Sequence, residues 1–406
     1  MIPEGLRVLQ LPMPASEVVY CGIAVHAGTR HETASEHGLA HFCEHLCFKG
    51  TQRRSARQII NAIEGLGGEL NAFTNKEDTV FYCVIQRQHW RKAVDVLCDI
   101  VFCSQFPQQE VEKEREVVCD EIESYEDSPA ELIYDEFENL LFDSHPLGHN
   151  ILGNADAVRS YTSDDARRFT QCWYRPENCL LFVTESLPKK TLPLPLPEKV
   201  AYPATHDQQT DGVTLSPLTS EEAEGRLVIR SRATHQAHVM TGTRTFAAND
   251  DRRWALYLLN NILGGPAMNS RLNLSLRERN GLVYTVDSTM VSYSDTGLWA
   301  VYFGCDPHDV NRCLWLVRRE LDRLMEKPLS PTQLRAAKQQ LQGQLVIASE
   351  NREQYVLDRA RAVLHTGKEL TLADVMARID RLTADDLLST ARQLFTPGNI
   401  VTLIYK

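Results

Sequence analysis

The chain has 406 residues, of which 43% are hydrophobic and 24% are charged, and its formal net charge is −11. This balance is typical of a globular protein large enough for two to four domains, and it excludes an intrinsically disordered chain. The acidic charge argues against a nucleic-acid partner, and no apolar run approaches the roughly 20 residues that span a bilayer, so we also expect no membrane partner.

The N-terminal segment MIPEGLRVLQLPMP has no basic region followed by an apolar core, which favours a cytoplasmic protein. The eleven cysteines are odd in number and stand in apolar stretches such as TVFYCVI and LCDIVFC. We therefore expect reduced, buried thiols rather than disulfides.

The first motif that carries chemistry is His-x-x-Glu-His at residues 41–45, within the segment HGLAHFCEHLCFKGT. Its apolar residues recur at helical spacing, which predicts a helix that stops near Gly50. On that helix His41, Glu44 and His45 share one side, because successive residues turn by about 100°. Two imidazoles at this spacing suit zinc, and a neighbouring carboxylate can serve as general base.

The alternative for this segment is an ordinary amphipathic helix with surface histidines, because an isolated His-x-x-Glu-His also arises by chance. Cys43 and Cys47 could bind zinc as thiolates, but at helical spacing they face away from the histidines. We expect both to be packing residues. A catalytic zinc also needs a third protein ligand, which must come from elsewhere in the chain.

The next segment, GGELNAFTNKEDTVFYCVI (67–85), predicts a strand after a Gly-Gly turn, with the alternation that suits an edge strand. An extended peptide could add a further strand to such an edge through main-chain hydrogen bonds. The alternative is an interior hairpin strand with Asn71 in a turn.

A charged helix predicted over EVEKEREVVCDEIESYED (110–127) offers many carboxylates, most of which belong to a solvated face. Glu114 and Glu121 are seven residues apart, about two helical turns, and so share a face with Val117 and Val118. A carboxylate on an apolar face needs a partner, because burying an unpaired charge is costly. Zinc or a ligating histidine would be such a partner.

The chain contains an internal repeat, in which residues 157–184 resemble residues 377–405. In each copy a threonine followed by two acidic residues predicts a capped helix, and a turn with Pro and Asn leads into a β-rich run. Five matched pairs share one offset of 221 residues: Thr162 and Thr383, Asp164 and Asp385, Asp165 and Asp386, Pro176 and Pro397, Asn178 and Asn399.

The repeat indicates an α+β fold of two homologous domains, each a mainly antiparallel sheet packed by helices. Between the copies, residues 186–212 are rich in proline, which favours an extended linker. We expect a first domain at 1–190, a Pro-rich linker at 191–215 and a second domain at 216–406.

Together these motifs resemble the pitrilysin/insulinase family of inverted zinc peptidases, in particular its short-chain branch with the mitochondrial processing peptidase β-subunit and bacterial relatives. The resemblance covers nearly the whole chain. It implies that His41, His45 and Glu121 are zinc ligands, that Glu44 is the general base, and that Glu114 orients a ligating histidine. It also implies that Asn71 and Ala72 contact the backbone of a peptide substrate.

A further match lies in the second domain, at SRLNLSLRERNGLVYTV (270–286). Here Arg277 and Tyr284 resemble an Arg-Tyr pair that reaches the zinc site and holds the substrate carbonyl near the scissile bond. Without the resemblance, Tyr284 would be read as a core residue of the strand. The metal ligands have no copy in this half, where Gln344 stands roughly at the position that answers Glu121.

Long members of the family enclose the substrate with four such domains, whereas this chain has two. The resemblance therefore implies a homodimer, each chain forming half of a clamshell, in which Arg277 and Tyr284 of one subunit complete the zinc site of the other. It implies a zinc-dependent endopeptidase that hydrolyses unfolded peptides in a closed chamber. The alternatives are a non-catalytic, structural or peptide-holding member of the same fold, and a peptidase dedicated to one precursor.

Overall fold

A computed structural model describes residues 5–186, 226–232 and 234–406. The elements of the first half are β1 (Arg7–Gln10), β2 (Val18–Val25), α1 (Leu39–Cys47), α2 (Ala56–Ile63), β3 (Glu69–Thr74), β4 (Thr79–Gln86), α3 (Trp90–Phe102), α4 (Gln108–Glu126), α5 (Pro129–Leu141), α6 (Ala155–Ser160), α7 (Ser163–Trp173) and β5 (Cys179–Val183). Those of the second half are β6 (Leu227–Arg230), β7 (Ala237–Thr245), α9 (Arg253–Gly264), the π-helix η5 (Asn273–Glu278), β8 (Val283–Ser292), β9 (Gly297–Cys305), α10 (Val310–Glu326), α11 (Pro331–Ser349), α12 (Arg352–Thr366), α13 (Leu372–Arg381), α14 (Ala384–Leu394) and β10 (Val401–Tyr405).

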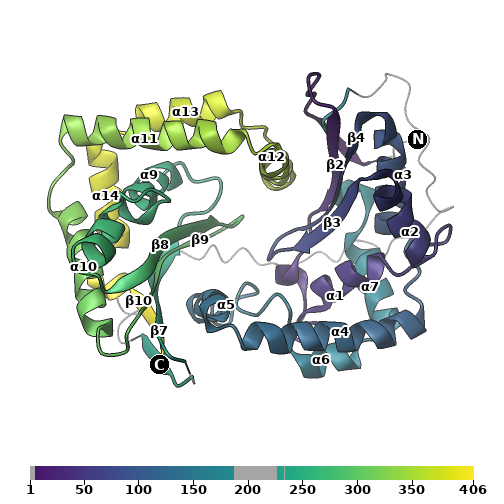
Figure 1. Ribbon diagram of the computed structural model, residues 1–406, viewed down its shortest axis with the longest axis horizontal. Coiled ribbons are helices and arrows are strands. Elements are labelled where there is room, and N and C mark those ends of the chain that lie inside the picture. Colours follow the sequence, from purple (N-terminus) through teal and green to yellow (C-terminus); the bar gives the residue numbers. More distant parts are fainter. Residues whose placement is uncertain (1–4, 187–225, 233) are drawn as a thin grey trace. The chain divides into compact units, whose positions relative to one another are not determined.

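The described strands form two five-stranded sheets with the same topology (Figure 1). The first sheet has the order β1-β5-β2-β4-β3 and the second the order β6-β10-β7-β9-β8. In each sheet the first pair is parallel, and the remaining pairs are antiparallel. This confirms the predicted α+β fold with duplicated, mainly antiparallel sheets, and it places β3 and β8 at corresponding edges.

The sequence repeat corresponds to a repeat of local structure. Thr162 accepts a hydrogen bond from the backbone N–H of Asp165 at the start of α7, and Thr383 does the same with Asp386 at the start of α14. A short 3-10 turn follows each helix, at Pro176–Asn178 and Pro397–Asn399, and leads into β5 or β10. The matched residues are therefore the caps and turns that fix the ends of these elements.

The molecule divides into two compact units that are not continuous in sequence. Unit 1 contains the described residues of 1–124 and 144–209 together with 352–369, and unit 2 contains 125–143, the described residues of 210–351 and 370–406. Helix α12 therefore belongs to the unit of the first half, and α5 to the unit of the second. The expected domains at 1–190 and 216–406 do not include this exchange of helices, in which each half of the chain contributes one helix to the other unit. The expected linker at 191–215 lies outside the described residues.

In unit 1 the sheet has an apolar cluster on each face. One face packs against α1, α2, α3 and α7 through buried residues that include Ile23, Phe81 and Leu181. The other face is covered by α12, whose apolar side chains pack with those of the strands: Val356, Leu357, Ala360 and Leu364 with Leu9, Leu11, Ala24, Val80, Leu180 and Phe182. The imidazole of His365 also lies 2.6 Å from the buried carboxylate of Asp78.

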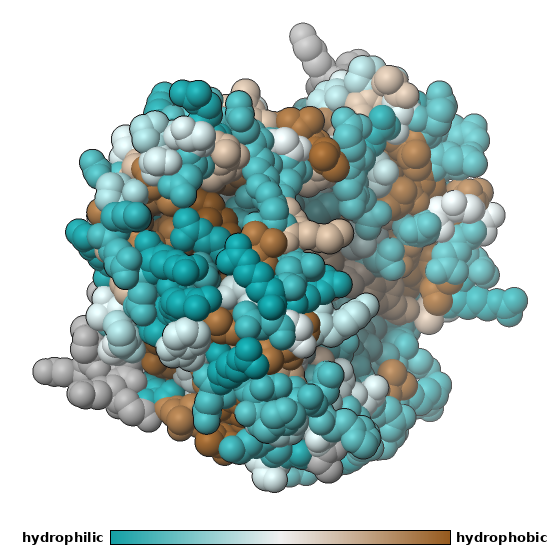
Figure 2. Space-filling model, turned by 60° about the vertical axis from the view of Figure 1, so that its left-hand side comes forward, coloured by the Kyte–Doolittle hydropathy of each residue, from teal (hydrophilic) through white to brown (hydrophobic). Residues whose placement is uncertain are grey.

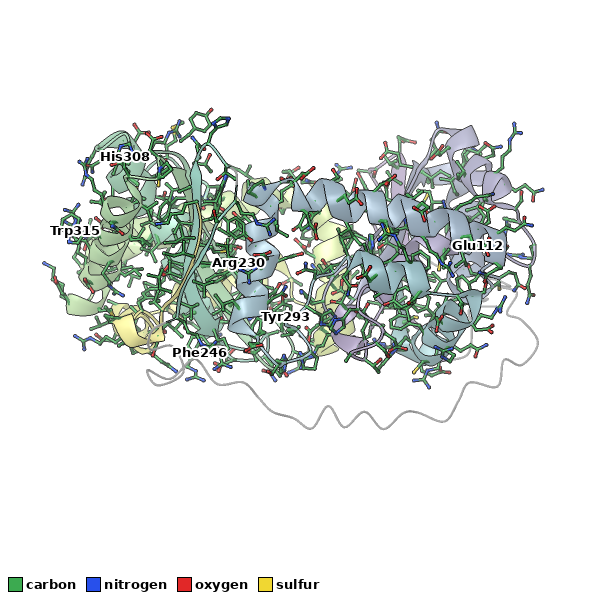
Figure 3. All side chains as sticks on the ribbon, turned by 90° about the horizontal axis from the view of Figure 1, so that it is seen from below. Glu112, Arg230, Phe246, Tyr293, His308 and Trp315 are labelled. Carbon is green, nitrogen blue, oxygen red and sulfur yellow. The ribbon has the colours of Figure 1, made fainter. Side chains whose placement is uncertain are left out.

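In unit 2 the helices α9, α10, α11, α13 and α14 share an apolar core with one face of the sheet, which includes Val301 and Phe303. Tyr302, which alternates with them on β9, contacts Tyr134 of α5 instead, so α5 covers the opposite face. Arg230 and Tyr293, labelled in Figure 3, contact two carboxylates of α5, Glu136 and Glu138 respectively.

All eleven cysteines are free, and all except Cys172 are buried, which confirms the expectation of reduced, buried thiols. Among the residues that the structure describes, no helix is both long and apolar enough to cross a membrane. The face shown in Figure 2 is mainly hydrophilic with scattered apolar side chains, in keeping with the charged composition.

Candidate metal centre

The predicted metal-binding helix is α1, which begins after Gly38 and ends at Cys47, before the expected stop near Gly50. Gly38 has a φ of 91°, a conformation that favours glycine. His41 and Glu44 are buried, with exposed fractions of 7% and 8%. Cys43 and Cys47 lie fully buried in the core of unit 1, which confirms that they are packing residues.

His41, His45 and Glu121 each bring one ligand atom to a common point, and these atoms lie within 4.8 Å of one another. Nε2 of His45 is 3.5 Å from Oε2 of Glu121, and Nε2 of His41 is 3.8 Å from Oε1 of the same carboxylate. Ligands about 2.0–2.2 Å from a tetrahedral zinc would be separated by roughly 3.3–3.6 Å. The donor types suit zinc; the 3.5 Å separation falls within this range, and the 3.8 Å separation lies slightly above it.

The two imidazoles differ in their electrostatic surroundings. Burial, together with the nearby His45, lowers the pKa of His41 to about 3, so this ring is neutral and has a lone pair to offer a metal. Burial also disfavours a charged His45, but its hydrogen bond to Glu114 and the charges of Glu44 and Glu121 outweigh burial and raise the pKa of His45.

Glu114 lies next to Nδ1 of His45; that it orients a metal-ligating ring stays a prediction. Its Oε1 atom is 3.0 Å from Nδ1 of His45, and its Oε2 atom is 2.6 Å from Nζ of Lys49. Burial opposes the charge of Glu114, but the contacts with His45 and Lys49 outweigh it and lower the pKa of this carboxyl. Sequence reasoning missed Lys49, although its place one helical turn after His45 was an available signal.

Glu44 is held by a residue that the sequence did not identify. The hydroxyl of Thr74, the last residue of β3, donates a hydrogen bond of 2.6 Å to Oε2 of Glu44. Burial raises the pKa of Glu44, and the Thr74 bond opposes this increase only in part. A carboxylate of raised pKa is a stronger base, which suits proton abstraction near neutral pH. No pattern in the sequence pointed to Thr74.

Helix α4 supplies both Glu114 and Glu121, which lie two helical turns apart. The prediction that Val117 and Val118 both belong to an apolar, buried face with them is wrong for Val117. Val118 is buried, whereas Val117 is 49% exposed. The buried residues of α4 are Val111, Glu114, Val118, Cys119 and Ile122. At helical spacing the centre of this set lies to one side of Glu114 and Glu121. Val117 lies beyond the opposite edge of that side and faces solvent.

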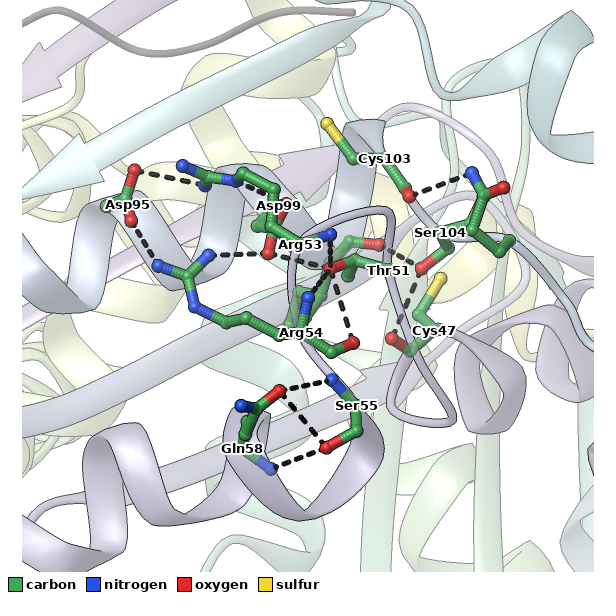
Figure 4. Close-up of polar contacts among 12 residues, drawn as sticks. Cys47, Thr51, Arg53, Arg54, Ser55, Gln58, Asp95, Asp99, Cys103 and Ser104 are labelled. Carbon is green, nitrogen blue, oxygen red and sulfur yellow. Dashed lines mark hydrogen bonds and ion pairs between the residues drawn. The ribbon is translucent and has the colours of Figure 1, made fainter.

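The C-terminal end of α1 is tied to α3 by a polar network (Figure 4). The hydroxyl of Ser104 donates to the last carbonyl of α1 at 3.2 Å. In the loop that follows, two arginines contact two aspartates of α3: Arg53 and Arg54 with Asp95 and Asp99. The Asp99 side chain is fully buried, so its charge depends on these partners, and the network fixes the position of the loop that leaves α1.

Strand β3 lies at the edge of its sheet, as predicted, with β4 as its hydrogen-bonded neighbour. Asn71 is exposed and Ala72 is half-buried on this strand. Helix α1 packs against β3, so this edge strand runs beside the helix that carries the candidate metal ligands His41 and His45. The hydroxyl of Tyr82 on β4 accepts a hydrogen bond from the Asn71 side chain. A peptide contact at Asn71 and Ala72 stays a prediction.

Arg277 and Tyr284 lie together in unit 2. Arg277 stands on the π-helix η5, and a turn at Gly281, with a φ of 60°, leads to Tyr284 on the edge strand β8. The guanidinium carbon is 5.6 Å from the centroid of the tyrosine ring. Tyr284 is 82% exposed and is therefore not a core residue.

Both side chains line a cavity of about 620 Å³ formed by α9, η5, β8 and α11. Gln344, which stands where the first half has Glu121, lines the same cavity. The second unit therefore offers an Arg-Tyr pair and an amide in place of metal ligands. The action of this pair at the metal centre stays a prediction.

Comparison with known proteins gives a consistent result along the chain. A family described as Insulinase (Peptidase family M16) matches residues 7–155, and one described as Peptidase M16 inactive domain matches residues 160–341. An uncharacterized zinc protease of Streptomyces coelicolor is 34% identical over 403 residues, covering 97% of this chain and 86% of the relative. Another from Bacillus subtilis is 30% identical, covering 99% of this chain and 96% of the relative.

Solved structures share the fold at lower sequence identity. The crystal structure of a protease from Helicobacter pylori has a TM-score of 0.88 at 20% identity, covering 100% of this chain and 98% of that protein. A putative M16-like peptidase from Alicyclobacillus acidocaldarius has a TM-score of 0.80 at 20% identity, covering 99% and 96%. These likenesses extend over both units.

Proposed function

The chain belongs to the insulinase family of peptidases, family M16, and from this premise we propose that it is a zinc-dependent endopeptidase that hydrolyses unfolded peptides. The observation that carries the proposal is the convergence of His41, His45 and Glu121 beside the buried carboxylate of Glu44. A non-catalytic role is not favoured, because a protein that only holds peptides has no need of an intact donor set with a base beside it.

The residues of the chain divide the chemistry between them. His41, His45 and Glu121 would hold the zinc ion, which when bound polarises a carbonyl and acidifies water. Glu44 takes a proton from the attacking water and passes it to the leaving amine. Thr74 holds Glu44 in place, and Glu114 binds Nδ1 of His45, so Nε2 of that ring would be left to hold the ion.

The peptide would lie along β3 as an added strand, with its main chain paired to that of Asn71 and Ala72. Such binding reads the backbone of an extended chain, so folded proteins would be poor substrates. Arg277 and Tyr284 would stabilise the negative charge that develops on the scissile carbonyl, a contribution of about 2.7–4 kcal/mol for one such donor.

Substitution of Glu44 by Gln tests the base. We expect Glu44→Gln to lose peptide hydrolysis by a factor of about 10²–10⁴, since that is the usual contribution of general acid–base catalysis. Zinc content should stay at the wild-type level, because Glu44 is not a ligand. Hydrolysis of a varied peptide mixture, with and without a chelator, is the measurement; a fully active variant would refute the assignment. If the wild type cleaves one peptide of the mixture only, the reading as a dedicated processing peptidase gains support.

We further propose a homodimer that encloses a chamber, in which Arg277 of one copy acts at the metal centre of the other. Mixing Glu44→Gln subunits with Arg277→Ala subunits tests this. Random pairing should restore about one quarter of wild-type activity, because half of the dimers are mixed and each mixed dimer has one intact site. If mixed dimers form and the activity of the mixture does not exceed that of either variant alone, Arg277 acts in the site of its own subunit or has no part in catalysis.

A further inference from the structure

The N-terminal end of α1 is held by a buried carboxylate and a loop that the proposed mechanism does not use. The carboxylate is that of Glu32, whose side chain has no exposed surface. The loop is Ser-His-Pro-Leu-Gly-His-Asn-Ile-Leu-Gly, residues 144–153. Its second histidine, His149, had no role assigned from the sequence.

Glu32 supplies the cap that α1 cannot supply for itself. Gly38 occupies the N-cap position and has no side chain with which to bind the free N–H groups of the first turn. Oε2 of Glu32 accepts the N–H of Gly38 at 2.9 Å, and Oε1 accepts the N–H of Ala40 at 2.7 Å. The residue after Ala40 is the ligand His41, so the cap acts directly on the backbone that carries this ring.

His149 holds Glu32 in turn. Its Nε2 atom lies 2.9 Å from Oε2 of Glu32. The imidazole stacks on that of His37, with ring centroids 4.1 Å apart and ring planes within 7° of parallel. The ammonium of Lys76, itself buried, donates to the backbone carbonyl of His149. The Lys76 contact holds the backbone of His149, and the contacts with Glu32 and His37 hold its ring.

The loop and the start of α1 are in close backbone contact. Gly153 has a φ of 72°, and a Cβ atom placed on it would lie 2.2 Å from the carbonyl oxygen of His37 and 2.7 Å from Cα of Gly38. Only glycine at 153 allows this approach. A displacement of the loop would therefore be transmitted to the first turn of α1 rather than absorbed by a gap.

The two ligating histidines differ in what fixes their rings. His45 has Glu114 on its Nδ1 atom. The Nδ1 atom of His41 is buried and has no hydrogen-bond partner among the residues that the structure describes. A ligating imidazole usually depends on a hydrogen bond at its second nitrogen for its orientation. His41 lacks one, so its orientation depends on the backbone of the first turn.

We propose that Glu32 and His149 are positioning residues for His41, acting through the first turn of α1 and thereby setting the metal affinity of the site. The inference rests on the proposed function in that it takes zinc as the metal. The experiment measures metal binding alone. The positioning role can therefore be refuted while the proposed peptidase activity is upheld, and it can be upheld while that activity is refuted.

The experiment compares zinc and cobalt binding by the wild type, His149→Leu and His149→Gln, with His235→Leu, an exposed histidine of unit 2, as control. The leucine fills the space of the imidazole without a hydrogen bond, whereas the glutamine can still bind Glu32. We expect His149→Leu to weaken zinc binding about tenfold, the lower end of the usual effect of such outer partners, and to alter the visible spectrum of bound cobalt. We expect His149→Gln and the control to keep wild-type affinity and spectrum.

A variant that merely loosens the fold would lower the melting temperature without changing the cobalt spectrum of the molecules that stay folded. Glu32→Gln is measured in parallel, because it places an amide N–H₂ against the N–H donors of α1 without leaving an unpaired buried charge. It should also weaken zinc and alter the cobalt spectrum. Wild-type affinity and spectrum in either Glu32→Gln or a folded His149→Leu would overturn the proposal, as would a loss in His149→Gln equal to that in His149→Leu.

Discussion

The contact between Glu114 and His45 leads to a prediction whose magnitude follows from the structure. In Glu114→Gln the amide oxygen can still accept from Nδ1 of His45, but the negative charge shared by His45 and Lys49 is lost. A hydrogen bond to a charged group stabilises by about 1.5–3 kcal/mol and one between neutral groups by about 0.5–1.5 kcal/mol. The difference of about 1–1.5 kcal/mol corresponds to roughly tenfold weaker zinc binding.

Glu114→Ala removes the acceptor as well, and we expect a loss of zinc affinity of about 10–100-fold. The assay is competition with a chromophoric chelator, accompanied by thermal unfolding to show that the variants are folded. Glu112→Gln is the matched control, because Glu112, labelled in Figure 3, stands on the same helix and its side chain is exposed. The reasoning is refuted if both Glu114 variants bind zinc as tightly as the wild type, or if the control loses as much.

Three further predictions concern unit 1. Leu364→Ala should lower the free energy of unfolding by about 2–5 kcal/mol in urea titration, since a buried leucine of α12 is truncated against the first sheet; an unchanged midpoint would contradict the packing of α12. Burial opposes the charge of Asp78, but His365 and Arg361 outweigh it and lower the pKa of this carboxyl below its ordinary value of 3.8. The stability advantage of wild type over Asp78→Asn should therefore be full above that value and shrink as the pH falls through the folded pKa, and an advantage that grows on acidification would be the wrong sign. In thiol titration Cys172 should react first in the native protein and all eleven cysteines after unfolding, whereas rapid reaction of several native thiols would contradict their burial.

The parts of the fold that depend on local signals could be predicted from the sequence. The caps at Thr162 and Thr383 are short-range motifs, so their repetition revealed the duplication before any contact was known. The same holds for His41, Glu44 and His45, whose common side follows from helical geometry alone. Glu114 and Glu121 needed the resemblance to give them different roles.

The parts that depend on long-range contacts could not be predicted. Thr74 meets Glu44 across 30 positions of the chain, and His149 meets Glu32 across 117, with no periodic pattern to connect them. The exposed Val117 shows the same limit on a single helix. Sequence spacing shows which residues share a face of a helix. Which face is buried depends on the elements that pack against the helix.

The exchange of α5 and α12 has a consequence for synthesis of the protein. A chain that grows from its N-terminus has made every strand of the first sheet once residue 183 is added, yet one face of that sheet stays without its cover until α12 has followed. Apolar side chains such as Leu180 and Phe182 would meet solvent during that interval, which invites association with other nascent chains. We expect the first half to need shielding by a chaperone while the ribosome completes the second.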